Sequence, residues 1–373
     1  MIVVFTGDFC VANDILRTRP VPELIRLPEY YAADKRIVNL EQAVGNRKPR
    51  TNKISIYADR RALLFLEALK INIGVLANNH ILDLGLEGIV DTAVALRSLG
   101  KEVVGAGRDL IEARKPVYID PSNAILAYCG HHRYYPRNVS LADVVTPGAA
   151  PIDEELIHAD LEALPENVRA VLQLHCGREN FRMVPAHVLA LFKRLLRHPK
   201  VSLIIGHHPH IPQGWLCENG KFAFLSLGNF LFPNWYFMDK QSVGFPEPPP
   251  MCPETWRLGP VPCITRKTWT EENRRALLVI FDTNTGKVGW IWGKQRRNEP
   301  VIDSMQEKEV RRIERRMKFR SWTYRWPIGI YSFFSGIDNF VQSLIFRLEK
   351  KAIYWLLKWK CFPKRAPFSG TIG

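Results

Sequence analysis

The stretch 203–213, with the sequence LIIGHHPHIPQ, places three histidines within four residues, directly after a short apolar run. The run is β-branched, which predicts a buried strand. His208 and His210 flank a proline, and an extended step around that proline would aim both imidazoles at one point. Imidazoles held by a rigid strand end are typical metal ligands. We favour this interpretation over a polar loop with satisfied histidines, because matching groups follow other strands.

Two carboxylates also follow predicted strands. The first strand, residues 2–6, is followed by Gly7 and Asp8, and the run 36–40 is followed directly by Glu41. Proteins of the α/β class place site residues just beyond the carboxyl ends of buried strands. Alone, Asp8 could be a turn residue or a helix N-cap, and Glu41 could be a solvated loop acid. The repetition of the pattern favours a functional role for both.

A third strand end carries an amide next to an imidazole. The predicted strand 71–76 is followed by Asn79 and His80, and Asp83 comes three residues later. An asparagine offers a neutral oxygen ligand, and a histidine can bind a metal or transfer a proton. We expect Asp83 to cap or orient His80.

Further histidines follow two more predicted strands. His175 comes directly after the strand 169–174 and is another candidate ligand. His131 and His132 follow the strand 124–129. For this pair, substrate contacts and ordinary loop positions both remain open.

The candidate residues suit a centre that holds divalent transition metals. Strand ends converge on one rim of a sheet, so these side chains could meet in space. The set comprises Asp8, Glu41, Asn79, His80, His175, His208 and His210. Carboxylates, an amide oxygen and imidazoles suit one or two ions of Mn, Fe or Zn. A shared carboxylate can bridge two ions about 3.5–4 Å apart. A water molecule bound between the ions then ionises near neutral pH. A histidine that is not a metal ligand can protonate the leaving group.

Strand and helix signals alternate through most of the first 230 residues. Helices are predicted over residues 60–70, 86–99, 154–163 and 185–197, and further strands over 102–104 and 222–227. This alternation predicts an α/β fold with polar residues at the strand ends. The runs 276–282 and 287–292, joined by the turn sequence TNTG, predict a hairpin that closes the domain near residue 300.

Residues 233–274 break this pattern. The segment is rich in proline and tryptophan, includes the sequence EPPP and has no clear period. It is too long for an ordinary connection, so we interpret it as an insertion that is either a functional loop or a lid.

Composition limits the classes of protein to consider. The 373 residues are 46% hydrophobic and 24% charged, which predicts a globular chain with a large core. The seven cysteines are odd in number and form no CxxC pair, which favours a reducing compartment. No signal peptide and no apolar run of about 18 residues is evident. We therefore expect a cytoplasmic protein, peripheral on the inner face of the cell membrane if it is membrane-associated.

The tail, residues 304–373, carries most of the excess positive charge. The formal net charge of the chain is +15, and the tail contains 15 Lys and Arg against 5 Asp and Glu. A basic helix is predicted over 307–320, and after Pro327 apolar residues recur at helical spacing. Two interpretations remain open, a helix lying on an anionic membrane surface and a helix pair packed on the domain. Nucleic acid is less favoured as a partner, because no recognition fold is evident.

The ordered motifs resemble the CapA family of poly-γ-glutamate capsule synthesis proteins, a branch of the calcineurin-like metallophosphoesterase superfamily. These motifs are GD at 7–8, NLE at 39–41, NNHILDLG at 78–85, HCGRE at 175–179, GHHPHIPQ at 206–213 and SLGNF at 226–230. The resemblance implies a four-layer α/β/β/α sandwich over residues 1–300, to which the basic amphipathic tail, residues 304–373, is added.

The resemblance also implies roles for individual residues. The positions that match metal ligands are Asp8, Glu41, Asn79, His175, His208 and His210, and His80 would lie near the leaving group. We assign catalytic roles to His80, Asp83 and Glu179. We assign substrate contacts to Asn78, His131, His132, Arg178, Gln213 and Asn229.

Two functions follow as hypotheses. The first is a metal-dependent hydrolase that acts on a phosphoester or on a γ-glutamyl or related acyl link in an anionic capsule polymer. The alternative is a non-catalytic accessory subunit of a membrane-associated polymer synthase, docked through its basic tail. A variant of the alternative makes the tail itself the functional element, as a membrane-binding adaptor.

Overall fold

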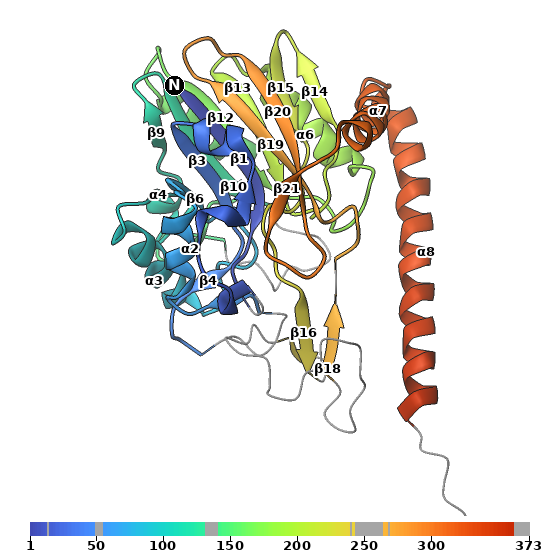
Figure 1. Ribbon diagram of the computed structural model, residues 1–373. Helices are drawn as coiled ribbons and strands as arrows, with labels where there is room; N and C mark the ends of the chain where they lie inside the picture. Colours follow the sequence, from blue (N-terminus) through green and yellow to red (C-terminus); the bar gives the residue numbers. More distant parts are fainter. Residues whose placement is uncertain are drawn as a thin grey trace, which may run out of the picture.

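The computed structural model describes residues 1–12, 15–48, 55–130, 141–238, 241–242, 264–267 and 269–361 (Figure 1). His131, His132 and most of the 233–274 insertion lie outside the described residues. The fold is mixed α/β, as the alternating signals predict.

The first sheet contains the amino-terminal strand at its centre. Its strands in spatial order are β2 (Ile25–Arg26), β21 (Ile302–Ser304), β20 (Val288–Gln295), β19 (Arg275–Asp282), β1 (Ile2–Phe9), β3 (Lys35–Leu40), β6 (Ile73–Val75) and β7 (Glu102–Val104). From β1 to β7 the neighbouring strands run parallel, whereas β19 pairs with β1 in antiparallel orientation. The predicted hairpin is confirmed as β19 and β20, and it extends this sheet.

The second sheet is also parallel at its centre. Its order is β14 (Trp215–Glu218), β15 (Lys221–Phe224), β13 (Val201–His207), β12 (Arg169–His175), β10 (Asn123–Cys129) and β9 (Val117–Asp120). The strands β10, β12, β13 and β15 run parallel to one another. β10, β12 and β13 are buried over almost their whole length, as expected from their mostly apolar sequences.

The two sheets share one hydrophobic core. Phe5 and Ile37 of the first sheet belong to the same buried cluster as Val171 and Ile205 of the second. The helices α2 (Ala62–Ala68) and α3 (Leu86–Arg97) add apolar side chains to this cluster. A separate cluster is formed where α5 (Glu154–Ala163) and α6 (Ala186–Arg197) pack on the second sheet.

Several short elements have no clear signal in the sequence. The helices α1 (Pro28–Ala32) and α4 (Leu110–Ala113) are each about one turn long, and η1 (Ile15–Arg17) and η2 (Pro22–Leu24) are 3₁₀ turns. Short strand pairs are β4 (Ala43–Val44) with β5 (Tyr57–Ala58), and β8 (Ala106–Gly107) with β11 (Gly148–Ala149). Within the insertion, β16 (Trp235–Met238) pairs with β17 (Gln241–Ser242) and β18 (Ile264–Lys267).

The predicted strand 222–227 is too long at its carboxyl end. β15 ends at Phe224, and the following residues leave the second sheet. The Leu227 amide then donates to the Gly206 carbonyl, and the Leu277 amide donates to the Leu227 carbonyl. This segment therefore links β13 of one sheet to β19 of the other.

The two sheets meet most closely at Gly7 and Gly228. The amide of Asp8 donates to the Gly228 carbonyl, and the Phe230 amide donates to the Asp8 carbonyl. A Cβ atom on Gly7 would lie 1.8 Å from the Gly228 carbonyl oxygen, so only glycine fits. Gly228 itself has a φ of 72°, a conformation that glycine adopts readily.

The tail begins as two helices, α7 (Glu307–Thr323) and α8 (Ile328–Cys361), on one side of the molecule (Figure 1). Ile313 and Met317 of α7 belong to the shared core. The Tyr331 hydroxyl at the start of α8 donates to the Val184 carbonyl over 2.7 Å. The first part of the tail is thus built into the domain. Among the described residues, no helix has the length and apolar character required to cross a membrane.

The contact between Gly7 and Gly228 generates a test of the fold. Gly7→Ala should destabilise the protein by about 3 kcal/mol or more, because its methyl group meets backbone that cannot move aside. Gly289→Ala is the matched control, since a Cβ atom at this strand position meets nothing within 4 Å. Urea unfolding followed by circular dichroism measures both. Equal stability of the two variants would show that the close approach is absent.

Candidate metal centre

The carboxyl ends of parallel strands from both sheets meet at one rim. The candidates that the sequence points to lie at these ends: Asp8 on β1, Glu41 after β3, Asn79 and His80 after β6, His175 on β12, and His208 and His210 after β13. The structure brings together Asp8, Glu41, Asn79, His175, His208 and His210, because the segment 226–230 holds the two sheets face to face at this point.

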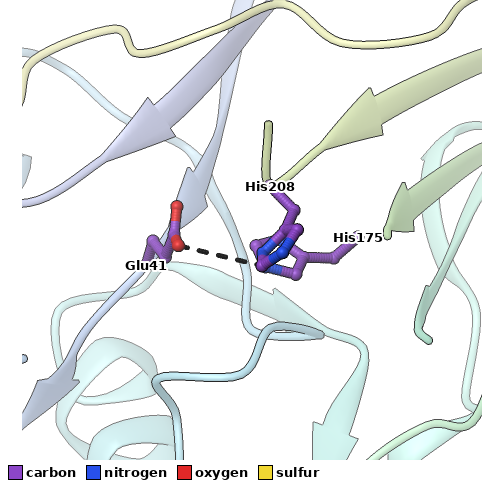
Figure 2. A group of neighbouring side chains, drawn as sticks. All are labelled: Glu41, His175 and His208. Atoms are coloured by element: carbon purple, nitrogen blue, oxygen red, sulfur yellow. Dashed lines mark hydrogen bonds and ion pairs between the residues drawn. The ribbon is translucent and has the colours of Figure 1, made fainter. Parts of the chain in front are cut away.

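The first ligand group consists of Glu41, His175 and His208. Figure 2 shows the carboxylate of Glu41 facing the two imidazoles, which come from neighbouring strands of the other sheet. The His175 Nε2 atom lies 3.9 Å from the Glu41 Oε1 atom and 3.1 Å from the His208 Nδ1 atom. One ligand atom from each residue lies within 4.8 Å of the other two, a spacing that fits one metal ion.

The second ligand group consists of Asp8, Glu41 and His210. The His210 Nδ1 atom lies 3.1 Å from the Asp8 Oδ2 atom, and its Nε2 atom lies 3.6 Å from the Glu41 Oε1 atom. Here too, one ligand atom from each residue lies within 4.8 Å of the other two. Within the described residues these are the groups that can hold an ion, and Glu41 belongs to both.

The backbone of the HPH step differs from the prediction. His208 and His210 have φ values of 96° and 57°, so both lie in the left-handed region rather than in an extended conformation. The prediction of an extended step is therefore wrong. A left-handed conformation costs about 1–2 kcal/mol for a residue with a side chain. The surrounding contacts impose it, and it turns both imidazoles toward the carboxylates.

Glu41 is an uncompensated buried carboxylate. It is fully buried, and neither of its oxygens has a hydrogen-bond partner among the described residues. Burial raises the pKa of Glu41 well above its ordinary value, and the negative charge of Asp8 raises this pKa further. An orphaned carboxylate surrounded by imidazoles is what a cation site contains when its cation is left out.

Asp8 is in the opposite electrostatic state. Burial alone would raise its pKa, but contacts with His207 and His210 hold the pKa of Asp8 well below its ordinary value. The Asp8 carboxylate in turn raises the pKa of His210 despite the burial of that imidazole. Burial and the neighbouring His208 lower the pKa of His175, so His175 is neutral and its lone pair is available to a metal.

Asn79 and His80 lie beside the first ligand group. The Asn79 Oδ1 atom is 2.8 Å from the His175 Nε2 atom. The His80 Nδ1 atom is 2.7 Å from the Asp83 Oδ2 atom, which also accepts a hydrogen bond from the Ile56 amide. A carboxylate can only accept, so Asp83 holds the proton of His80 on Nδ1 and leaves Nε2 facing away from this bond.

The predicted substrate contacts are engaged in different ways. Asn78 and Gln213 are buried, and their amides donate to the carbonyls of Leu40 and Phe181. Asn229 is also buried, and its Oδ1 atom lies 2.8 Å from the His210 Nδ1 atom. These three side chains are therefore held by hydrogen bonds within the protein.

Arg178 and Glu179 lie nearer to solvent. Arg178 is half-buried, and its guanidinium lies 3.8 Å from the Phe181 ring centre. Glu179 is exposed, yet its charge acts on both Glu41 and His210. Glu179 therefore lies at the solvent side of the centre.

Four residues of the centre are missing from the sequence prediction. The Asn39 amide donates to Asp8 over 2.8 Å, and the His207 Nδ1 atom lies 3.4 Å from the same carboxylate. The Gln173 Oε1 atom lies 2.7 Å from the His207 Nε2 atom, and the ring centroids of Trp269 and His210 are 5.4 Å apart. Asn39 and His207 lie inside recognised motifs and could have been found there. Gln173 and Trp269 have no such signal.

Fold and site together define an α/β protein with a buried carboxylate–histidine centre at the ends of its parallel strands. The chain belongs to the family described as "Bacterial capsule synthesis protein PGA_cap", whose model matches residues 3–234. The resemblance predicted from the motifs is thereby confirmed, and the matched region contains every residue of the two ligand groups.

Curated relatives carry names from the same field. The chain is 28% identical over 221 residues to the PGA biosynthesis protein CapA of Bacillus subtilis, covering 58% of each chain. It is 26% identical over 173 residues to the capsule biosynthesis protein CapA of Bacillus anthracis, covering 45% of this chain and 42% of the relative. A probable polyglutamine synthesis accessory protein of Mycobacterium tuberculosis is 34% identical over 109 residues, 27% of each chain. Each match spans less than two thirds of the relative's length.

The isolated charge of Glu41 generates a prediction about stability. In protein treated with a chelator, Glu41→Gln should raise the free energy of unfolding by about 1–3 kcal/mol, because it removes a buried charge. Since the pKa of Glu41 is raised in the fold, ionisation of this side chain destabilises the fold as the pH rises above 4.5, its ordinary pKa. The difference between the two proteins should therefore grow with pH. Urea titrations at several pH values measure it, and a difference independent of pH would contradict the assignment.

Proposed function

We propose that the chain is a metal-dependent hydrolase of the metallophosphoesterase type, acting in capsule polymer metabolism. The sharing of Glu41 by the two ligand groups carries this proposal. The packing of helices against two facing sheets supports the four-layer sandwich that this class has. The family membership and the names of the relatives support the assignment to capsule synthesis.

The residues present fit a pair of divalent ions. His175 and His208 would hold one ion, Asp8 and His210 the other, and Glu41 would bridge them, with the Asn79 oxygen beside the first. Such ions supply a water that ionises near neutral pH and a positive charge for an ester or acyl oxygen. Asn39 and Asn229 orient the ligand side chains through the hydrogen bonds described above.

We assign the protonation of the leaving group to His80. Asp83 accepts from Nδ1, which fixes the orientation of the ring. His80 is 7% exposed, so its imidazole is largely shielded from solvent. A histidine held in this way can donate from Nε2 to the oxygen or nitrogen that departs.

The substrate class is an anionic capsule polymer or its precursor. The names of the relatives point to PGA and capsule biosynthesis. We propose a phosphoester or a γ-glutamyl or related acyl link as the bond that is cleaved. Arg178, near the solvent side of the centre, offers a cation for a substrate carboxylate or phosphate.

A second candidate function is that of an accessory subunit of a polymer synthase. One relative is named as an accessory protein, which favours this alternative. In that case the centre would serve a structural role, and the partners would be synthase subunits. A peripheral position on the inner face of the membrane would fit either function and stays a prediction.

Metal content tests the proposed centre. Elemental analysis of wild-type protein reconstituted with Mn, Fe or Zn should find about two ions per chain. Glu41→Ala should lose most of both metal ions, because Glu41 belongs to both ligand groups. His175→Ala/His208→Ala should lose one metal ion. His158→Ala, an exposed histidine outside the centre, is the control and should retain the wild-type content. A wild type that binds no metal would reject the hydrolase and favour the accessory subunit.

Turnover separates the two candidate functions. With p-nitrophenyl phosphate, bis(p-nitrophenyl) phosphate and γ-glutamyl p-nitroanilide as probes, the metal-loaded wild type should hydrolyse at least one. His80→Asn should lower kcat about 10²–10⁴-fold, as expected for the loss of a general acid, while the metal content stays unchanged. Full metal content without turnover on these probes or on γ-glutamyl polymers would favour the accessory role.

A further inference from the structure

The helix α8 packs with its polar face toward the domain. Among its described side chains, Tyr331, Ser335 and Gln342 are buried, and they follow one another at helical spacing with Asp338 between them. Gln342 hydrogen-bonds to Asp338 and accepts from the Arg182 amide. An amphipathic helix on a domain in water normally buries its apolar stripe, so this orientation is inverted.

The helix α8 runs along one side of the molecule (Figure 1), and most of its described exposed side chains are apolar. Phe333 is 65% exposed and Phe340 is 69% exposed. The other exposed apolar residues on this helix are Ile328, Ile330, Phe334, Ile337, Val341, Leu344, Ile345 and Leu348. A continuous apolar face of this length marks a surface that meets something other than water.

An aromatic ladder continues this face onto α7. The ring centroids of Phe319 and Trp322 are 5.8 Å apart, and those of Trp322 and Trp326 are 5.2 Å apart. Trp326 then lies 5.5 Å from Phe334, which lies 5.5 Å from Phe333. The exposed sides of the two helices are therefore parts of one surface, which we call the α7–α8 face.

Exposed cations border the α7–α8 face. Arg315 lies one and two helical turns from Phe319 and Trp322, on the same side of α7. Lys318 and Arg325 line a cleft of about 280 Å³ between β14 and α7, together with Trp215 and Trp322. Among the described residues, neither Arg315 nor Arg325 has a carboxylate partner, so both charges are available to an outside anion.

We propose that the α7–α8 face docks on the surface of an anionic lipid bilayer, with α8 lying in the plane of the interface. Apolar and aromatic side chains enter the boundary between headgroups and acyl chains, and the bordering cations bind the lipid phosphates. Tryptophan at the edge of the face fits this depth, because its ring is apolar and its N–H remains hydrated. The proposal rests on packing and charge alone and is independent of the metal centre.

Co-sedimentation of the full chain with vesicles tests the proposal. The wild type should pellet with vesicles of phosphatidylglycerol and phosphatidylcholine, and much less with phosphatidylcholine alone. Phe333→Glu/Phe340→Glu should lower the partition coefficient about tenfold or more, because it places charges in the apolar face. Arg315→Glu/Arg325→Glu should lower it about tenfold on the anionic vesicles, and salt should weaken the wild type in the same way.

Matched controls lie on the other side of the molecule. Leu64→Glu/Val94→Glu changes exposed apolar residues of α2 and α3, which are 51% and 52% exposed. Arg19→Glu/Arg60→Glu makes the same change of charge as the arginine variant at exposed positions. Both controls should pellet like the wild type. All substituted side chains are exposed, so thermal melts of the variants should match that of the wild type.

Two results would overturn the proposal. One is equal pelleting of the wild type and the α7–α8 variants, or no pelleting of the wild type with anionic vesicles. The other is a dimer in light scattering of the vesicle-free wild type that Phe333→Glu/Phe340→Glu makes monomeric, which would assign the face to a second copy of the chain.

Discussion

The approach of Gly7 to Gly228 is the contact on which the site depends. At this point the backbone of β1 lies against the segment that leaves β15, with hydrogen bonds on both sides of Asp8. A side chain at Gly7 would push the two sheets apart, and a side chain at Gly228 would clash with Pro212. Residues of the first sheet supply the carboxylates, and residues of the second supply the imidazoles. The carboxylates and the imidazoles form one centre because the two sheets are in contact here.

The centre that results is costly for the protein alone. Asp8 and Glu41 are both fully buried, and their like charges oppose each other. His207 and His210 hold the pKa of Asp8 low, whereas neither oxygen of Glu41 has a hydrogen-bond partner among the described residues. The left-handed backbone at His208 and His210 adds conformational cost. A fold that keeps these features together stores free energy that a bound cation would recover, which is the usual condition of a functional site.

The sequence predicts this centre in part, and the reasons for success and failure differ. Parallel strands buried on both faces are apolar until they end, so the polar residues at 8, 41, 79, 175 and 208 stand out. Strand ends that share a rim then predict proximity without any knowledge of distances. The left-handed turn at His208 could not be read in this way, because a residue before proline usually favours an extended conformation. The role of Trp269 could not be predicted from the sequence either, since its contact with His210 depends on where the chain re-enters the domain after the insertion.

The tail shows a related limit of sequence patterns. Helical periodicity predicts an apolar stripe on α8, but periodicity does not say which face is inside. That choice is made by contacts distant in the chain. Tyr331 binds the Val184 carbonyl, and Arg178 donates to the Ser343 hydroxyl. These bonds hold the polar face against the segments 178–184 and leave the apolar face outside. The segment 178–182 therefore lies between α8 and the centre, since Arg178 and the Arg182 amide bond to α8 and the charge of Glu179 acts on Glu41.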